Sequence, residues 1–168
     1  NAENLGPLPL IIALPAFAAT GESMLARGLT NISMSTRFDQ LIANGCRPFI
    51  AALPDTMTSV GGSQYVNSVG IGNYADYIMA EIKPFLRDYF NTSGKVGLLG
   101  HSSGGFGALH LAFEYPGEID GIACHAGDMG FDLMFLGELG PAIRGVSECG
   151  GLDRFMSEFW SKTRPNAS

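Results

Sequence analysis

Cysteine is scarce in this sequence, and so are positive charges and long apolar runs. Cys46, Cys124 and Cys149 stand far apart in the 168 residues. They lack the paired C-x-x-C spacing of a structural zinc site and are too few for a disulfide framework. At most one disulfide can form. Cys124 ends an apolar run and is expected to be a buried thiol.

The balance of charge is acidic. The chain carries 10 Lys and Arg against 16 Asp and Glu, a net charge of −6, and it has no basic cluster. This composition argues against binding to nucleic acid or to anionic membrane surfaces. No apolar stretch approaches the roughly 20 residues of a membrane span. Small neutral substrates fit such a chain better, and its compartment, cytoplasmic or secreted, stays open.

One apolar segment, Leu8–Ala19, has the length of a signal-peptide core. The residues before it, Asn1–Gly6, include no Lys or Arg, and Pro9 and Pro15 interrupt the segment. Buried parallel strands read as short continuous apolar runs. We therefore favour a buried strand at Leu8–Leu14 over a signal peptide.

Strand-like and helix-like segments alternate along the chain. The expected strands are Leu8–Leu14, Phe49–Leu53, Val96–Leu99 and Ile119–Cys124, and the expected helices are Ser35–Ala43, Asn73–Tyr89, Ser103–Tyr115 and Leu152–Trp160. The 54–72 segment is expected to be a loop, and 125–151 irregular with one short helix near Asp132–Leu136. This alternation predicts a single α/β domain over residues 1–168. Its mostly parallel sheet, of about four recognisable strands, would be covered by helices on both faces, giving three layers.

The spacing of apolar residues predicts which face of each helix is buried. Asn73 is expected to cap the second helix, and Pro84 to kink it. The predicted buried faces are Phe38, Leu41 and Ile42; Tyr74, Ile78, Ile82, Phe85 and Tyr89; Phe106, Leu109 and Phe113; and Leu152, Phe155, Met156 and Phe159.

The segment 100–104 reads G-H-S-S-G, a G-x-S-x-G motif between a predicted strand and a predicted helix. A serine on a sharp strand-to-helix turn exposes its hydroxyl, and the crowded backbone of such a nucleophile elbow favours glycine on both sides. The bare pattern also occurs in glycine-rich turns, but its position favours the elbow. Ser102 is therefore the candidate nucleophile.

Ligands of open parallel sheets bind beyond the carboxyl ends of the strands. Those ends lead into four polar loops, and two of the loops bring His101, His125 and Asp128 toward the candidate serine. These three residues are expected to line a pocket. The sequence offers no dinucleotide or phosphate-loop fingerprint, and neither a cofactor nor a metal is expected.

Three stretches resemble the putative-esterase family, which is related to esterase D and belongs to the α/β-hydrolase superfamily. They are G-S-Q-Y-V-N-S-V-G-I-G-N-Y-A-D-Y-I-M-A-E-I-K-P-F at 62–85, G-H-S-S-G-G-F-G-A-L at 100–109, and G-G-L-D-R-F-M-S-E-F-W at 150–160. The resemblance implies a serine esterase that acts on small carboxylic esters or thioesters through an acyl-enzyme on Ser102.

The resemblance also implies an oxyanion hole from the backbone N–H groups of Ser103 and Phe17. The family usually has His-Gly just before the second of these positions, where this sequence has Pro15-Ala16. Proline and alanine lack the backbone freedom of glycine, so the second donor departs from the family pattern.

A complete catalytic triad cannot be assembled from the three histidines. His101 directly precedes the serine and should point away from it. His110 lies about 12 Å down the predicted helix, and His125 has no acid in the hydrolase order at the right end of the sheet. The resemblance implies that the acid and base follow beyond residue 168, so the chain is expected to be the central part of a longer hydrolase.

Three alternatives stay open. A companion chain or a second copy of this chain could supply the missing strands. The domain could be a non-catalytic relative that binds a ligand in the same pocket. It could also be an acyltransferase that uses the same nucleophile.

Overall fold

The computed structural model describes residues 5–28, 32–58 and 60–163, with the backbone alone for 159–163. The predicted burial of the Phe159 side chain therefore lies outside the described residues.

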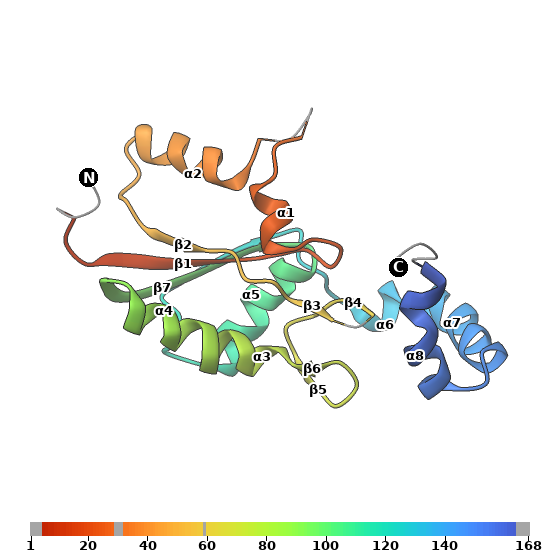
Figure 1. The fold of residues 1–168 in the computed structure, drawn as a ribbon. Helices are drawn as coiled ribbons and strands as arrows, with labels where there is room; N and C mark the ends of the chain where they lie inside the picture. Colours follow the sequence, from red (N-terminus) through yellow and green to blue (C-terminus); the bar gives the residue numbers. More distant parts are fainter. Residues whose placement is uncertain (1–4, 29–31, 59, 164–168) are drawn as a thin grey trace.

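Four parallel strands form the central sheet in the order β2-β1-β7-β8 (Figure 1). They are β1 Leu8–Leu14, β2 Ile50–Ala52, β7 Thr92–His101 and β8 Gly121–His125. On one face lie α1 Gly21–Leu25 and α2 Met34–Ala43, and on the other α3 Tyr74–Asp76, η2 Tyr77–Ile82, α4 Lys83–Tyr89 and α5 Ser103–Glu114. The predicted three-layer α/β fold with a parallel sheet is confirmed.

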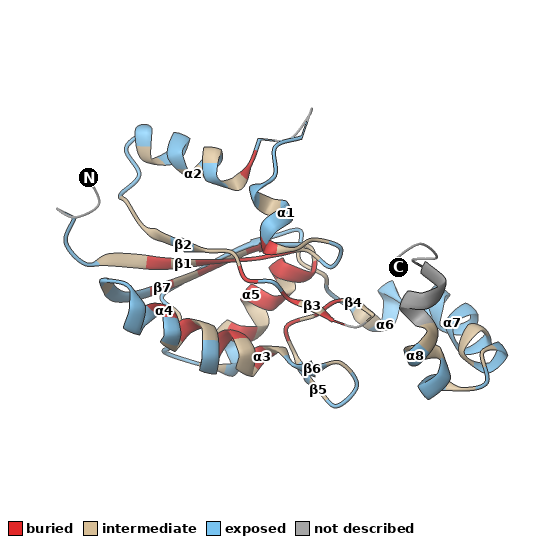
Figure 2. Cartoon of the chain, viewed as in Figure 1, coloured by how far each residue is buried: buried red, intermediate tan, exposed pale blue. Residues whose placement is uncertain are grey.

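The core lies between the sheet and the helices α3 to α5, where Figure 2 places most of the buried residues. Leu10, Ile12 and Leu14 of β1 alternate toward it, beside Val96 and Leu98 of β7. Each fully buried side chain of this kind contributes about 1.5–3 kcal/mol to stability. From the helices the core receives Ala75, Ile78, Met79, Leu86, Ala108 and Leu111.

The expected burial of the Cys124 thiol is wrong. Cys124 lies on β8, which is exposed along its whole length. This strand is at the edge of the sheet, and β7 is its partner among the described strands. An apolar run alone does not distinguish a central strand from an edge strand.

The helix predicted over Asn73–Tyr89 forms, but its buried face differs from the prediction. Phe85 and Tyr89 are 59% and 72% exposed, whereas Lys83 and Leu86 are buried. The cause is η2, a π-helical stretch just before Pro84, whose wider turns rotate the following residues around the helix axis. The wider turn also accommodates the proline ring.

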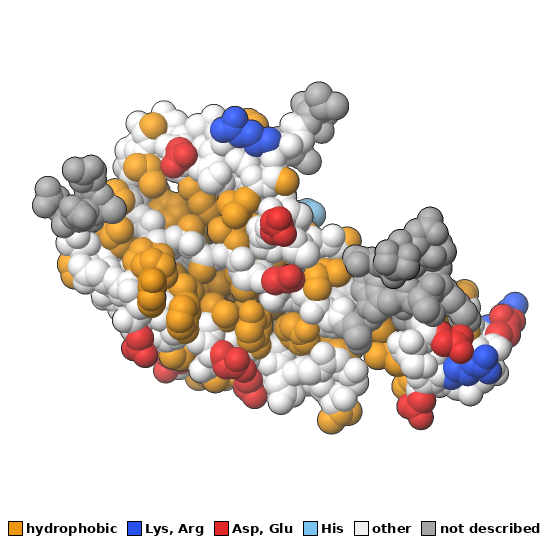
Figure 3. All heavy atoms as spheres, in the orientation of Figure 1, with side chains coloured by type: hydrophobic (Ala, Val, Ile, Leu, Met, Phe, Trp, Pro, Cys, Tyr) orange, Lys and Arg blue, Asp and Glu red, His pale blue; other side chains and the backbone are white. Residues whose placement is uncertain are grey.

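Figure 3 shows hydrophobic side chains gathered between α2 and α4.

The cap of this helix also differs from the prediction. Asn73 precedes α3, but its side chain makes no capping hydrogen bond. Instead Oδ1 of Asn67 accepts from the Asp76 backbone N–H at 3.1 Å. The cap therefore comes from the preceding loop, which holds two short antiparallel pairs that the sequence did not predict: β3 Met57–Thr58 with β4 Gly61–Gly62, and β5 Asn67–Ser68 with β6 Gly72–Asn73.

Helix α5 packs against the sheet through small residues. Its buried positions include Gly104, Gly107 and Ala108, while Phe113, predicted to be buried, is 79% exposed. A helix that starts at a tight turn from a central strand lies too close to the sheet for large side chains.

On the opposite face of the sheet, α2 has no fully buried residue, and the predicted burial of Leu41 is also wrong.

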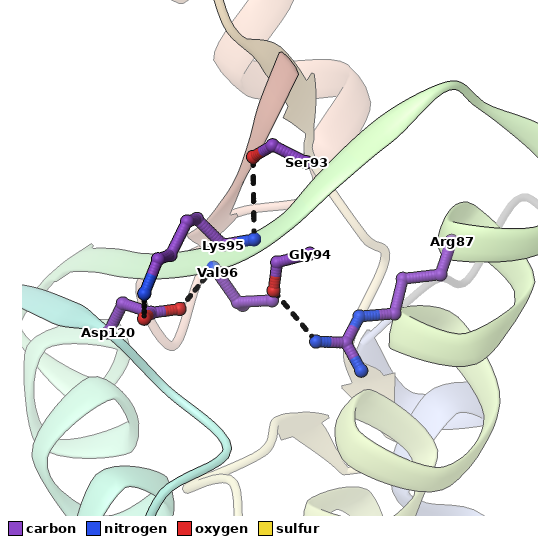
Figure 4. A network of polar contacts seen from close by, with 6 residues as sticks. All are labelled: Arg87, Ser93, Gly94, Lys95, Val96 and Asp120. Atoms are coloured by element: carbon purple, nitrogen blue, oxygen red, sulfur yellow. Dashed lines mark hydrogen bonds and ion pairs between the residues drawn. The ribbon is translucent and has the colours of Figure 1, made fainter. Parts of the chain in front are cut away.

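At the amino ends of the strands, Asp120 ties β7 to the start of β8 (Figure 4). Its carboxylate accepts from Lys95 Nζ at 2.7 Å and from the Val96 backbone N–H at 2.8 Å. These bonds, the Lys95 contact first, lower the pKa of the Asp120 carboxyl, and the same contact raises the pKa of Lys95. Arg87 of α4 donates to the Gly94 carbonyl at 2.8 Å. Polar contacts therefore hold the amino ends of β7 and β8 together.

The C-terminal part is helical, with α6 Phe131–Met134, α7 Leu136–Glu148 and α8 Leu152–Thr163. The last helix was predicted, but α7 was not, since it contains Pro141 and three glycines that disfavour a helix. These helices lie to one side of the sheet (Figure 1), and neither α6 nor α7 has a buried residue. Contact with the rest of the fold includes the rings of Phe106 and Phe131, whose centroids are 4.8 Å apart.

Candidate active site

Ser102 occupies a strained turn between β7 and α5. Its φ is 56° and its ψ −123°, a region that residues other than glycine rarely adopt. The turn is held on both sides, because Ser102 N–H donates to the His125 carbonyl at 3.1 Å and the Ser102 carbonyl accepts from Phe106 N–H at 3.0 Å. Such strain persists only where surrounding contacts impose it.

Glycine is required around this turn because backbone segments approach closely. A Cβ on Gly100 would lie 2.2 Å from the carbonyl carbon of Gly104, and a Cβ on Gly104 would lie 2.1 Å from the carbonyl oxygen of Leu14. Neither neighbour is a flexible side chain that could move aside. The two glycines of the G-x-S-x-G motif are therefore dictated by packing against β1 and α5.

The Ser102 hydroxyl has a carboxylate as its partner. Its Oγ donates to Asp128 Oδ1 at 3.1 Å, and Gln64 Nε2 donates to Asp128 Oδ2 at 3.3 Å. The backbone adds a further bond, from Asp128 N–H to the Ser102 carbonyl at 3.3 Å. Three segments distant in sequence thus meet at the Asp128 carboxylate. Asp128 was among the residues expected near the serine, whereas Gln64 was not, since no motif marks it.

The two expected oxyanion donors come from separate segments, Ser103 at the start of α5 and Phe17 in the loop between β1 and α1. Ser103 is the first residue of α5, so its N–H has no acceptor within the helix. Its side chain is fully buried, and its Oγ has no hydrogen-bond partner among the described residues. The backbone of Phe17 packs on Gly62, where an added Cβ would lie 2.0 Å from the Phe17 carbonyl oxygen. The 54–62 segment thus supports the loop that carries Phe17.

The histidines do not contact the Ser102 hydroxyl in the part of the chain that the structure describes. His101 and His125 are paired in register on β7 and β8, with ring centroids 5.0 Å apart. Both line a cavity beside α1 and α2. His110 stacks on Phe106, with centroids 5.5 Å apart. Across the described residues, no three His, Cys, Asp or Glu side chains converge as a metal site requires.

Tyr65 fastens the loop that leads to Gln64. This residue is fully buried with a φ of 59°, and its hydroxyl donates to the Pro15 carbonyl at 2.6 Å and contacts Thr56 Oγ1 at 3.1 Å. Burial raises the pKa of the Tyr65 hydroxyl well above its ordinary value. Tyr65 therefore belongs to the core.

The model of an esterase family, described as "Putative esterase", matches residues 19–163. No curated protein matches the chain significantly.

Solved structures share the fold. A ferulic acid esterase superposes with a TM-score of 0.64 at 19% identity, covering 76% of this chain and 49% of that protein. FphF of Staphylococcus aureus, a fluorophosphonate-binding serine hydrolase, gives a TM-score of 0.56 at 18% identity, covering 78% and 47%. An S-formylglutathione hydrolase from Agrobacterium tumefaciens gives 0.54 at 17%, covering 70% and 46%.

The chain spans about half the length of these three structures. In the described residues no helix is both long and apolar enough to span a membrane.

Proposed function

Because this chain belongs to the esterase family, we propose that it is the nucleophile-bearing part of a serine hydrolase that cleaves small carboxylic esters or thioesters. Ser102 is the nucleophile, and the reaction proceeds through an acyl-enzyme. The single observation that carries the proposal is the strained backbone of Ser102 at the strand-to-helix junction, with φ 56° and ψ −123°.

The proposed chemistry uses the exposed side of that turn. Ser102 Oγ attacks the acyl carbon while a general base takes its proton, and the carbonyl oxygen becomes an oxyanion. The protonated base then returns the proton to the leaving alcohol or thiol, and water hydrolyses the acyl-enzyme with the same base as proton acceptor. The N–H of Ser103 is available at the start of α5, where the helix dipole also favours negative charge. The N–H of Phe17 is the second proposed donor, and it has no hydrogen-bond acceptor among the described residues.

Asp128 sets the starting geometry of the nucleophile. Because the carboxylate accepts the Ser102 proton at 3.1 Å, the lone pairs of Oγ are directed away from Asp128. The bond from Gln64 fixes the second carboxylate oxygen, which limits rotation of the carboxylate. We assign both as residues that position the hydroxyl. The general base comes from residues other than the three histidines, consistent with relatives about twice as long as this chain.

Labelling with a fluorophosphonate tests the proposal. The native protein should form a covalent adduct whose peptide mass places it on Ser102, and Ser102→Ala should abolish it. Ser147→Ala, an exposed serine on α7, is the matched control and should label like the native protein. If the full-length protein, with its fold confirmed, stays unlabelled, the assignment is wrong and the non-catalytic binding module is favoured. A label on Ser103 would also refute the assignment to Ser102.

A further inference from the structure

His101, the residue before the proposed nucleophile, lines a cavity whose described ionisable lining residues are all basic. The cavity, of about 750 Å³, lies between α1, the start of α2 and the ends of β7 and β8. Arg27, Arg37, His101 and His125 line it, and its described lining includes no Asp or Glu. In a chain with 16 acidic and only 10 Lys and Arg residues, this is a local reversal of the overall charge.

The two arginines are available to a ligand. None of the ion pairs among the described residues involves Arg27 or Arg37. Arg37 uses its Nε to donate to the Ile32 carbonyl at 3.4 Å, and its terminal Nη groups have no acceptor within the described residues. A guanidinium with unused Nη groups presents a planar pair of donors that matches a carboxylate or a phosphate.

A second, apolar cavity of about 370 Å³ adjoins the first. The two share Met24, Met34, His101 and His125. The remaining lining is apolar and includes Ala16 and Gly100, which come just before Phe17 and His101-Ser102 in sequence. An apolar compartment therefore adjoins a positively charged one, and His101, the residue before the proposed nucleophile, lines both.

We propose that these adjoining cavities bind an ester that carries a negatively charged group, a carboxylate or a phosphate. The apolar part of the substrate lies against Met24 and Met34, and the anion pairs with Arg27 and Arg37. This inference rests on the proposed esterase function and narrows its substrate class. A chain of net charge −6 repels anions at long range, so a local cluster of positive charge is needed to bind an anionic substrate.

Two pairs of substrates test the proposal and separate the two possible positions of the charge. In the first pair, 4-nitrophenyl hemiglutarate carries the charge on the acyl side and 4-nitrophenyl butyrate is its neutral counterpart. In the second pair, 4-acetoxybenzoate carries the charge on the alcohol side and phenyl acetate is neutral. The measured quantity is the ratio of kcat/KM for the charged ester to that for the neutral ester.

The variants are Arg27→Gln and Arg37→Gln, with Arg47→Gln as the matched control. Arg47 is an exposed arginine in the connection between α2 and β2 and does not line the cavity. Its variant therefore removes the same single positive charge as each cavity variant, at a position outside the cavity. Each cavity variant should lower the ratio about fivefold for the pair with the correct charge position. The control should leave it unchanged. If neither pair responds to the cavity variants, or if the control responds equally, the proposal is wrong.

Binding without turnover separates this inference from the catalytic one. Calorimetric titration of glutarate and of 4-hydroxybenzoate into Ser102→Ala should show saturable binding of one of them, weakened by adding Arg27→Gln. Arg27 makes no hydrogen bond among the described residues, so this variant keeps the test valid if Arg37→Gln fails to fold. Saturable binding without fluorophosphonate labelling of the native protein would refute the esterase alone. Labelling without binding of either anion would refute the anion site alone.

Discussion

Gly107 faces the ring of Tyr65 so closely that the exchange Gly107→Ala tests the packing of the whole site. An added Cβ would lie 2.4 Å from Tyr65 Cδ2, where ordinary contacts begin at 3.4 Å. The ring would have to retreat by about 1 Å. It cannot do so freely, because Tyr65 is fully buried and its hydroxyl is bonded to the Pro15 carbonyl at 2.6 Å.

The expected magnitude follows from two opposing effects. Overpacking a core costs about 1–3 kcal/mol, while replacing glycine by alanine inside a helix gains about 1 kcal/mol. The matched control is Gly145→Ala in α7. A Cβ there has no neighbouring atom within 4 Å, so this variant gains only the higher helix propensity of alanine. The two variants should therefore differ in free energy of unfolding by about 1–3 kcal/mol, with Gly107→Ala the less stable.

Urea unfolding followed by circular dichroism measures this difference directly. Thermal unfolding gives a second readout, at about 2–4 °C for each kcal/mol in a domain of this size. A Gly107→Ala protein at least as stable as Gly145→Ala would refute the close approach of α5 to the 54–65 segment. The support proposed for Gln64 and Phe17 would then fail as well.

Four further outcomes are expected. The pKa of Asp120 is lowered in the folded state, so its contribution to stability is present above the unfolded carboxyl pKa and is lost as pH falls through the folded pKa. Asp120→Asn should therefore reduce the loss of stability at acid pH, measured as urea unfolding midpoints over a pH series. Contact with Lys83 lowers the Glu118 pKa in the same way. Glu118→Gln should destabilise the protein in urea unfolding near neutral pH, because the Lys83 side chain, only 6% exposed, loses its charged partner. Leu111→Ala should cost about 2–5 kcal/mol of unfolding free energy, since its side chain is fully buried. Gln64→Leu, which removes the bond to Asp128, should slow fluorophosphonate labelling of Ser102 while unfolding midpoints change little, whereas an unchanged labelling rate would remove its positioning role.

The proposal that the chain is the central part of a longer hydrolase has its own measurement. Both outer strands, β2 and β8, have one partner each among the described strands. The mass of the intact purified protein should exceed the 17.8 kDa of the 168 residues. A mass equal to that value would favour a companion chain or a second copy as the source of further strands, which the oligomeric state in solution would then decide.

Sequence reasoning located the elements that depend on neighbours in the chain. The strand Leu8–Leu14 has the predicted bounds, and α5 begins where the G-x-S-x-G motif placed it. An unbroken apolar run and a serine between glycines are local signals, so they survive without knowledge of the fold. The charged lining of the cavity had no such signal, since Arg27, Arg37, His101 and His125 are scattered over about a hundred residues.

The sequence by itself determined an α/β chain with a candidate nucleophile on a strand-to-helix turn. Only the tertiary structure decided which carboxylate meets that hydroxyl, which helix faces are buried and where positive charge collects. Asp128 reaches Ser102 from 26 residues away in sequence, and Gln64 bonds to Asp128 from 64 residues away. The π-helical turns before Pro84 move Leu86 inward in place of Phe85. These outcomes depend on how close distant segments of backbone can approach, which periodicity along the chain does not record.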